Sequence, residues 1–192
     1  MIIDSGVCRL RSWKQTDLER LAELANDMRV ARYLRRRFPH PYTKNDAADW
    51  LSLVCHDGDS TYFAIEVDGR LAGGIGVEPL AGEHEGVADF GYWLGHDFWG
   101  RGIATAAARN VVRHAFETLD PRRLEAPVMA ANVASARVLE KAGFIRECEL
   151  RSWYVDREGA IHDGIMYRMT RSDYASTIGA LRQRRQPGAA VL

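Results

Sequence analysis

The sequence predicts an α/β (α+β) fold, in which one mixed and mostly antiparallel sheet carries helices on its faces. The first observation is the order of the apolar patterns: strand, two helices, three strands, helix, strand, helix and two strands. The second is the connection from the strand expected at 87–94 through a helix to the strand expected at 124–129, because such crossovers join parallel strands. The third is size, since 192 residues with 46% hydrophobic content suit one domain with a real core.

The first quarter of the chain predicts one strand and two helices. Residues 7–11 alternate apolar and polar side chains, as a half-buried strand does. Thr16 and Glu19 have the spacing of a capping box, and leucines follow at helical intervals. A second helix is expected to begin near Thr43. The connection at 32–42, between the two helices, is rich in arginine and aromatic residues.

The next segment predicts a three-stranded meander. Residues 62–67 are typical of a strand, and Asp68-Gly69 is a strong signal for a two-residue hairpin turn. Residues 71–78 form the expected returning strand, and residues 87–94 the third.

The second half alternates the two kinds of element. Helices are expected at 102–118 and 135–142, and strands at 124–129, 144–153 and 164–169. Gly143 closes the short helix at a position suited to left-handed backbone. Ser172 is expected to cap a last helix. We expect the domain to cover residues 1–181 and residues 182–192 to form a flexible tail.

Composition excludes several classes of protein. Lys+Arg and Asp+Glu both number 26, so nothing suggests a nucleic-acid partner. No apolar run approaches the roughly 18 residues that span a bilayer, and the N-terminus does not resemble a signal peptide. The three cysteines are single and widely spaced, which fits neither a metal site nor a disulfide framework. We therefore expect a soluble, cytoplasmic protein without a metal.

The most informative segment is the glycine-rich turn at 98–105, which lies between a strand and a helix with no polar capping residue. A helix start leaves backbone N–H groups without partners, and their partial positive charge suits an anion. Gly100 and Gly102 let a phosphate approach the backbone, Arg101 adds a positive charge, and Ala104 is small. The turn predicts a diphosphate site; the alternative is a tight turn without a ligand.

Two motifs together resemble the GNAT superfamily of N-acetyltransferases. The first is residues 98–105 (FWGRGIAT), preceded by residues 91–94 (GYWL); the second is residues 132–144 (NVASARVLEKAGF). The resemblance runs from about residue 8 to residue 174. Trp99 stands where the superfamily often has Gln or Arg, but it is usual in the RimJ/RimL-like group of ribosomal-protein alanine N-acetyltransferases, which the chain resembles most. The motifs are specific for the superfamily and much less so for the acceptor.

The resemblance implies a single GNAT-like domain with acetyl-CoA as cosubstrate. The cosubstrate would lie in a V-shaped cleft where the strands at 87–94 and 124–129 splay apart. Its pantetheine arm would pair with the backbone there and with Asn132, and its pyrophosphate would meet N–H groups of the turn. Asn132 has an alternative role as a helix cap. The implied cofactor-binding residues are Trp93, Leu94, Trp99, Gly100, Arg101, Gly102, Ile103, Ala104, Thr105, Asn132 and Ser135.

Direct acetyl transfer requires a neutral amine, a stabilised oxyanion and a departing thiolate. A free α-amine has a pKa of about 8, so one weak base or a chain of waters suffices to deprotonate it. A backbone N–H near Leu94 could serve the thioester oxygen. Carboxylates expected on strands that border the cleft are the candidate bases: Asp89, Glu78, Glu147 and Glu149. The alternative for each is a charged group that only faces solvent.

Ser135 is the candidate that protonates the thiolate. The tyrosine that many superfamily members carry in this helix is absent between Val138 and Phe144. The alternative for Ser135 is a cap or a hydrogen bond to the helix backbone. A covalent route through Cys148 is rejected, because a single cysteine without a nearby histidine is more often a core filler.

The acceptor side is expected at residues 32–42, which border the acceptor cleft in the family. The candidate substrate-binding residues are Arg35, Tyr33, Phe38 and Glu78. Arginines there could favour an acidic peptide or a carboxylate-bearing substrate, and the alternative is a solvated basic face. Trp13, Trp50 and Trp153 are expected to be packing residues unless one faces the cleft.

The predicted function is acetylation of a protein or peptide N-terminal α-amine by a monomer or homodimer. The first alternative is a small amine such as an amino acid, a polyamine or an antibiotic. The second is an acyl-CoA-binding module without catalysis. A nucleotide binder of another fold is disfavoured by the motif at 132–144. No nucleic acid or membrane is expected as a partner.

Overall fold

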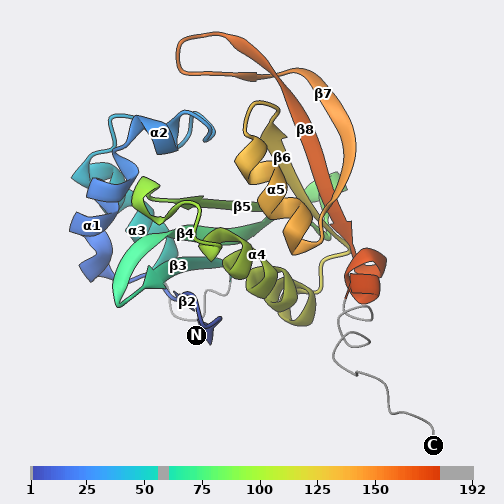
Figure 1. Cartoon of the computed structure of the whole chain (residues 1–192), viewed down its shortest axis with the longest axis horizontal. Coiled ribbons are helices and arrows are strands. Elements are labelled where there is room, and N and C mark those ends of the chain that lie inside the picture. Colours follow the sequence, from blue (N-terminus) through green and yellow to red (C-terminus); the bar gives the residue numbers. More distant parts are fainter. Residues whose placement is uncertain (1, 56–60, 178–192) are drawn as a thin grey trace, which may run out of the picture.

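The computed structural model describes residues 2–55 and 61–177. One eight-stranded sheet runs through this part of the chain in the order β1-β2-β3-β4-β5-β6-β8-β7 (Figure 1). The strands are β1 (Ile2–Asp4), β2 (Arg9–Arg11), β3 (Tyr62–Val67), β4 (Arg70–Pro79), β5 (Val87–Leu94), β6 (Arg123–Met129), β7 (Ile145–Val155) and β8 (Ile161–Thr170).

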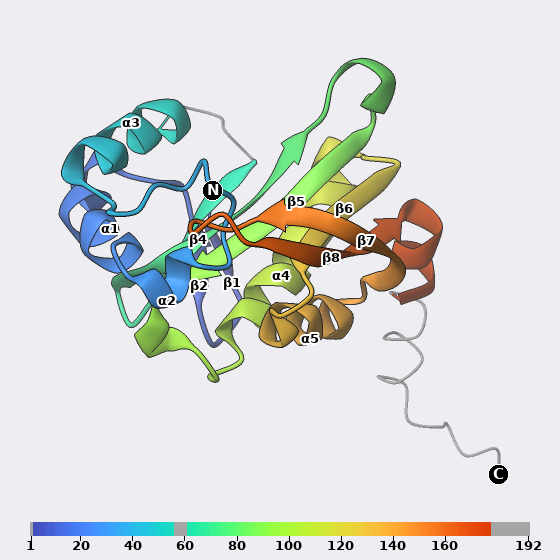
Figure 2. The same ribbon diagram turned by 90° about the horizontal axis from the view of Figure 1, so that it is seen from above.

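Helices cover both faces of the sheet. They are α1 (Leu18–Ala25), α2 (Met28–Ala31), α3 (Lys44–Val54), α4 (Ile103–His114) and α5 (Val133–Ala142). Helices α1 and α3 pack together on one face, and α4 and α5 pack together on the other (Figure 2). This arrangement confirms the predicted α/β (α+β) fold. No helix in the described ranges is both long and apolar enough to cross a membrane.

The meander β3–β4–β5 is antiparallel, as the sequence predicts. Its first turn places Asp68 and Gly69 at φ 51° and 74°, which is the left-handed region that a two-residue turn needs. Large apolar side chains of these strands are fully buried, among them Phe63, Ile65 and Val77. Their burial fixes the register that aligns residues of β4 and β5 across the site.

The only parallel pair in the described sheet is β5 with β6, and it is short. Val87, Ala88 and Asp89 pair with β6, after which β5 continues beside β4 and β6 continues beside β8. The two strands therefore part beyond Asp89, which confirms the V-shaped splay. Strand β8 lies between β6 and β7, so β7 forms the edge of the sheet.

The N-terminal prediction needs two corrections. Residues 7–11 yield a strand only at β2, and the sequence did not indicate β1. The capping box of Thr16 with Glu19 does not form; Asp17 instead accepts from the N–H of Lys14 at 3.0 Å. Arg11 holds both oxygens of Asp17 at 2.8 Å, so a tertiary ion pair orients this helix start.

Later helix ends also differ from expectation. Helix α4 is followed by a π-helical turn at Ala115–Leu119, and α5 begins before Ser135 because Asn132 caps it. Gly143 closes α5 at φ 100°, as predicted. The last helix already includes residue 171, so Ser172 is not its cap. The predicted domain end at 181 and the tail at 182–192 lie outside the described residues.

Candidate active site

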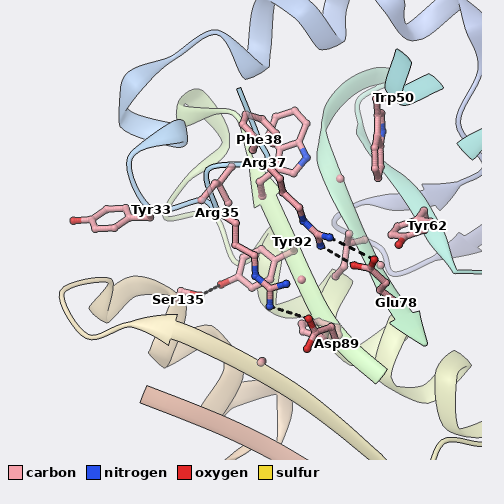
Figure 3. A pocket seen from close by; sticks show the side chains of 18 of the residues that line it. Tyr33, Arg35, Arg37, Phe38, Trp50, Tyr62, Glu78, Asp89, Tyr92 and Ser135 are labelled. Atoms are coloured by element: carbon pink, nitrogen blue, oxygen red, sulfur yellow. Dashed lines mark hydrogen bonds and ion pairs between the residues drawn. The ribbon is translucent and has the colours of Figure 1, made fainter. Parts of the chain in front are cut away.

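A cavity of about 860 Å³ lies where β5 and β6 part. Its walls come from β4, β5, β6, α3, α5 and the segment 32–42 between α2 and α3, which we call the acceptor segment. Lining residues on the splay side include Tyr92, Val128, Met129, Asn132, Ser135 and Leu139. Those on the other side include Phe38, Tyr42, Trp50 and Tyr62. Figure 3 shows Ser135 and Trp50 on opposite sides of the cavity.

The start of α4 has the features of an anion site. Gly100 and Gly102 adopt φ of +73° and +76°, and a Cβ at either would meet no atom within 4 Å. No side chain caps the helix, and the first N–H paired with the turn is that of Ala106 with the Gly102 carbonyl. The N–H groups of residues 103–105 thus have no capping side chain, and such groups at a helix start suit an anion.

Trp99 and Arg101 support this turn in different ways. The indole N–H of Trp99 donates to the Leu94 carbonyl at 2.9 Å, which ties the turn to the end of β5. Arg101 is half exposed, lies 3.9 Å from Asp68, and leaves its charge accessible from solvent. Neither residue lines the cavity, so the turn lies outside it.

Ser135 forms hydrogen bonds with Asn132, which sequence analysis considered, and with Tyr92, which it did not. Asn132 Oδ1 accepts from the Ser135 N–H at 3.2 Å, so Asn132 is a helix cap. The Tyr92 hydroxyl donates to Ser135 Oγ at 3.0 Å (Figure 3). Burial raises the pKa of Tyr92 to about 12, against the opposing effect of this hydrogen bond. Tyr92 therefore remains a proton donor at neutral pH.

Glu78 on β4 and Asp89 on β5 are register partners, so their side chains leave the sheet on one face. Arginines of the acceptor segment reach both: Arg35 lies 2.8 Å from Asp89, and Arg37 lies 2.7 Å from Glu78 (Figure 3). The hydrogen bond from Arg37 holds the pKa of Glu78 below its usual range. The side chains of Arg35 and Arg37 are 43% and 64% exposed, so both ion pairs lie at an open rim.

The structure does not bring Glu147 and Glu149 to the cavity. Arg123 donates two hydrogen bonds to Glu147 and so lowers the pKa of that carboxyl. Glu149 forms ion pairs with Arg146 and Arg151 on the same edge strand. Both carboxylates stabilise the edge of the sheet, away from Ser135.

The aromatic side chains of the acceptor segment point in different directions. Phe38 lines the cavity and packs against Tyr42 and Trp93, with ring centroids 4.9 and 5.6 Å apart. Tyr33 borders the cavity, but its ring stacks on Arg32 and points outward (Figure 3).

The three tryptophans also divide. Trp13 is buried in the core, which confirms its predicted packing role, and it also borders the cavity; Trp50 lines the cavity as well. Trp153 does not line it and is 53% exposed.

Two hydrogen bonds from Arg157, in the turn between β7 and β8, hold the acceptor segment in place; we call them the clasp. Arg157 donates to the carbonyl of Ala31 at 3.2 Å and to the carbonyl of Phe38. Near the same turn, Tyr154 lines the cavity and donates to the Pro127 carbonyl at 2.9 Å. The hairpin thus fixes one wall of the cavity.

Cysteine and metal chemistry find no support in the described ranges. Cys8, Cys55 and Cys148 are free thiols, and no group of three or more His, Cys, Asp or Glu side chains there could hold a metal ion. Cys148 is exposed on β7, whereas the sequence suggested a core position. It does not line the cavity.

Sequence analysis missed Tyr92, Tyr154 and Arg157, and it counted Arg37 among the arginines of residues 32–42 without its pairing to Glu78. A signal for Tyr92 was present: side chains alternate along a strand, so Tyr92 had to face opposite to Asp89 and Trp93, toward the helices that follow β5. Arg37 and Arg157 act between segments distant in sequence, which no local pattern indicates.

Comparison with known proteins defines the class. The acetyltransferase (GNAT) domain matches residues 8–145. The chain therefore belongs to the GNAT acetyltransferase family and is an acyltransferase that uses acetyl-CoA as cosubstrate.

Two related proteins and one solved structure are similar to this chain over most of its length. The Bacillus subtilis protein named "Putative ribosomal N-acetyltransferase YdaF" is 30% identical over 172 residues, which cover 86% of this chain and 92% of the relative. Spermidine N(1)-acetyltransferase of Escherichia coli K12 is 29% identical over 143 residues, 74% of this chain and 75% of the relative. The structure of Mycobacterium smegmatis RimJ in complex with CoA-disulfide superposes with a TM-score of 0.76 at 24% identity, covering 88% of this chain and 84% of that one. These results agree with the RimJ/RimL-like resemblance.

Proposed function

We propose that the acceptor is the N-terminal α-amine of a protein or peptide. The observation that carries this proposal is the open rim formed by the pairs Arg35–Asp89 and Arg37–Glu78. A chain that enters past this rim can leave its remaining residues in solvent. The name of the B. subtilis relative, a putative ribosomal N-acetyltransferase, supports the same acceptor class.

The cosubstrate is proposed to span the splay. N–H groups of residues 103–105, with Gly100 and Gly102, hold the pyrophosphate, and Arg101 adds charge. The pantetheine arm runs along β5 at Trp93 and Leu94, where β6 no longer pairs with it. Asn132, besides capping α5, lines the cavity that the arm enters.

The proposed chemistry is direct transfer of the acetyl group from sulfur to nitrogen. Asp89 is the candidate base: Arg35 donates to its Oδ2 at 2.8 Å, and Oδ1 is left to act on the ammonium directly or through water. Backbone N–H groups of β5 near Leu94 stabilise the oxyanion. Ser135 donates its proton to the leaving thiolate, while Tyr92 donates to Ser135 Oγ and strengthens it as an acid.

A polyamine is the second candidate acceptor. The carboxylates of Glu78 and Asp89 could attract a polycation, and one relative is a spermidine N(1)-acetyltransferase. Both carboxylates, however, are already neutralised by arginines. A polyamine would have to displace these arginines, so the peptide acceptor is preferred.

The test is CoA release measured with a set of peptides and a set of small amines. We expect turnover with peptides that have free α-amines and none with the same peptides after N-terminal blocking. Turnover with spermidine but with no peptide would replace the proposal by the second candidate. Acetyl-CoA binding without CoA release from any amine would indicate a binding module.

A further inference from the structure

On the sheet face that carries Glu78 and Asp89, the next positions along the strands are glycines. Gly76 and Gly91 are the next register pair on this face, and Gly74 follows on β4. All three line the cavity. A Cβ at Gly91 would meet no atom within 4 Å, so the space above it is open. We call these three residues the glycine floor.

Aromatic rings flank the glycine floor. On the α3 side, Trp50 makes edge contacts with Trp13 and Tyr62, with centroids 6.2 and 5.3 Å apart. On the acceptor-segment side, Phe38 makes an edge contact with Trp93 at 5.6 Å. All five rings line the same cavity. Figure 3 shows Trp50 and Phe38 entering from different elements.

Aromatic rings of the walls lie directly over two residues of the glycine floor. A Cβ at Gly74 would lie 2.8 Å from Trp13 and 2.9 Å from the indole nitrogen of Trp93. A Cβ at Gly76 would lie 2.6 Å from the ring of Tyr62. Rings thus cover Gly74 and Gly76, and the open part of the floor lies at Gly91, with the rings as its apolar sides; we call this space the slot.

Most carboxylates at the slot already have partners. Glu78 and Asp89, the carboxylates nearest the floor in register, each pair with an arginine. Asp46, also in the lining, accepts hydrogen bonds from the backbone and hydroxyl of Thr43 at the start of α3. Asp49 is the one lining carboxylate of the described residues without such a partner, so the slot offers mainly apolar and aromatic surface.

We propose that the acceptor carries a large apolar group, preferably aromatic, next to the reacting amine. This group lies over Gly91, the open part of the glycine floor, between Trp50 on one side and Phe38 with Trp93 on the other. For a peptide acceptor, the inference specifies the first side chain and rests on the proposed function. Rings meeting edge to face gain energy beyond the burial of area, so an aromatic side chain fits best.

The test compares peptides that differ only in residue 1: Ala, Leu, Phe or Trp. We expect kcat/KM for Phe and Trp to exceed that for Ala by about tenfold or more, with Leu between them. Equal or faster acetylation of the Ala peptide would overturn this inference and leave the proposed function intact. Acetylation of phenethylamine and tryptamine, with none of any peptide, would support the aromatic slot and contradict the peptide acceptor.

Two variants test whether the slot itself sets this preference. Gly91→Val adds a side chain to open space on a strand, where valine is well tolerated, and should abolish the preference for Phe while the Ala peptide is still used. Trp50→Ala should reduce the preference by removing one wall, and Trp153→Ala is the matched control because Trp153 lies outside this cavity. An unchanged Phe-to-Ala ratio in both Gly91→Val and Trp50→Ala would contradict the slot. Acetyl-CoA affinity, measured by calorimetry, should stay unchanged in all three.

Discussion

At the scale of single residues, two hydroxyl groups lie paired in the cleft. Tyr92 comes from β5 and Ser135 from α5, and the tyrosine donates to the serine at 3.0 Å. A serine hydroxyl that accepts such a bond becomes a better donor to a third group, here the departing sulfur. The tyrosine missing from α5 is thus replaced, in our proposal, by one from a strand.

Replacing Ser135 by Ala should lower kcat and leave acetyl-CoA affinity nearly unchanged. In our proposal the hydroxyl acts on the thiolate, which forms only as the reaction proceeds. General-acid groups contribute about 10²-fold or more to rate, so the loss should be easily measured. Steady-state kinetics and calorimetry on the same protein check this expectation, and unaltered turnover would remove Ser135 from the mechanism.

The carboxylates can be separated by a matched pair of substitutions. Asp89→Asn should reduce kcat/KM by about tenfold or more, because it removes the proposed base. Glu147→Gln should leave turnover within about twofold, since Arg123 lowers the pKa of Glu147 and the residue lies outside the cavity. Glu147 instead contributes stability above its unfolded pKa, which is lost as the pH falls through its lower folded pKa. Equal turnover losses in the two variants would exclude this assignment.

At the scale of elements, the start of α4 is the proposed site of the cosubstrate pyrophosphate. Gly102→Val should weaken acetyl-CoA binding by about tenfold, or 1.4 kcal/mol, because it places a side chain where the phosphates would lie. The φ of +76° also makes valine costly at this position. Gly6→Val is the matched control, with a φ of +79° and equally open surroundings at the β1–β2 turn. Calorimetric affinity that is the same in both variants would argue against the pyrophosphate assignment.

Elements with strong local signals could be predicted from the sequence, and those set by distant contacts could not. The turn at Asp68-Gly69 and the end of α5 at Gly143 were predictable, because their φ values demand special residues. The start of α1 was not, because the Arg11 guanidinium takes Asp17 into a tertiary ion pair.

The candidate site shows the same division. Motif residues indicated the anion turn and Ser135 from sequence alone. Placing Glu147 outside the cavity required the strand order, in which β8 lies between β6 and β7. Nothing local encodes that order, since either strand could have paired with β6.

At the scale of the whole molecule, the clasp at Arg157 links the C-terminal hairpin to the acceptor segment more than 100 residues earlier in the chain. Arg157→Ala should raise KM for the acceptor severalfold, because the segment loses the two hydrogen bonds that fix it. Acetyl-CoA affinity should not change, since the clasp is remote from the start of α4. Separate determination of both constants is the measurement, with Arg157→Lys expected to restore part of the acceptor KM. An equal loss of acetyl-CoA affinity would show that the clasp supports the fold in general.

The short junction between β5 and β6 also has a thermodynamic consequence. In the described sheet, three residue pairs of β5 and β6 join the strands β1–β5 directly to the strands β6, β8 and β7; we call these pairs the seam. A ligand bound in the splay beyond these pairs contacts both blocks and so stabilises their association. Because it binds only the assembled sheet, saturating acetyl-CoA should raise the melting temperature and slow amide hydrogen exchange on both sides of the seam together.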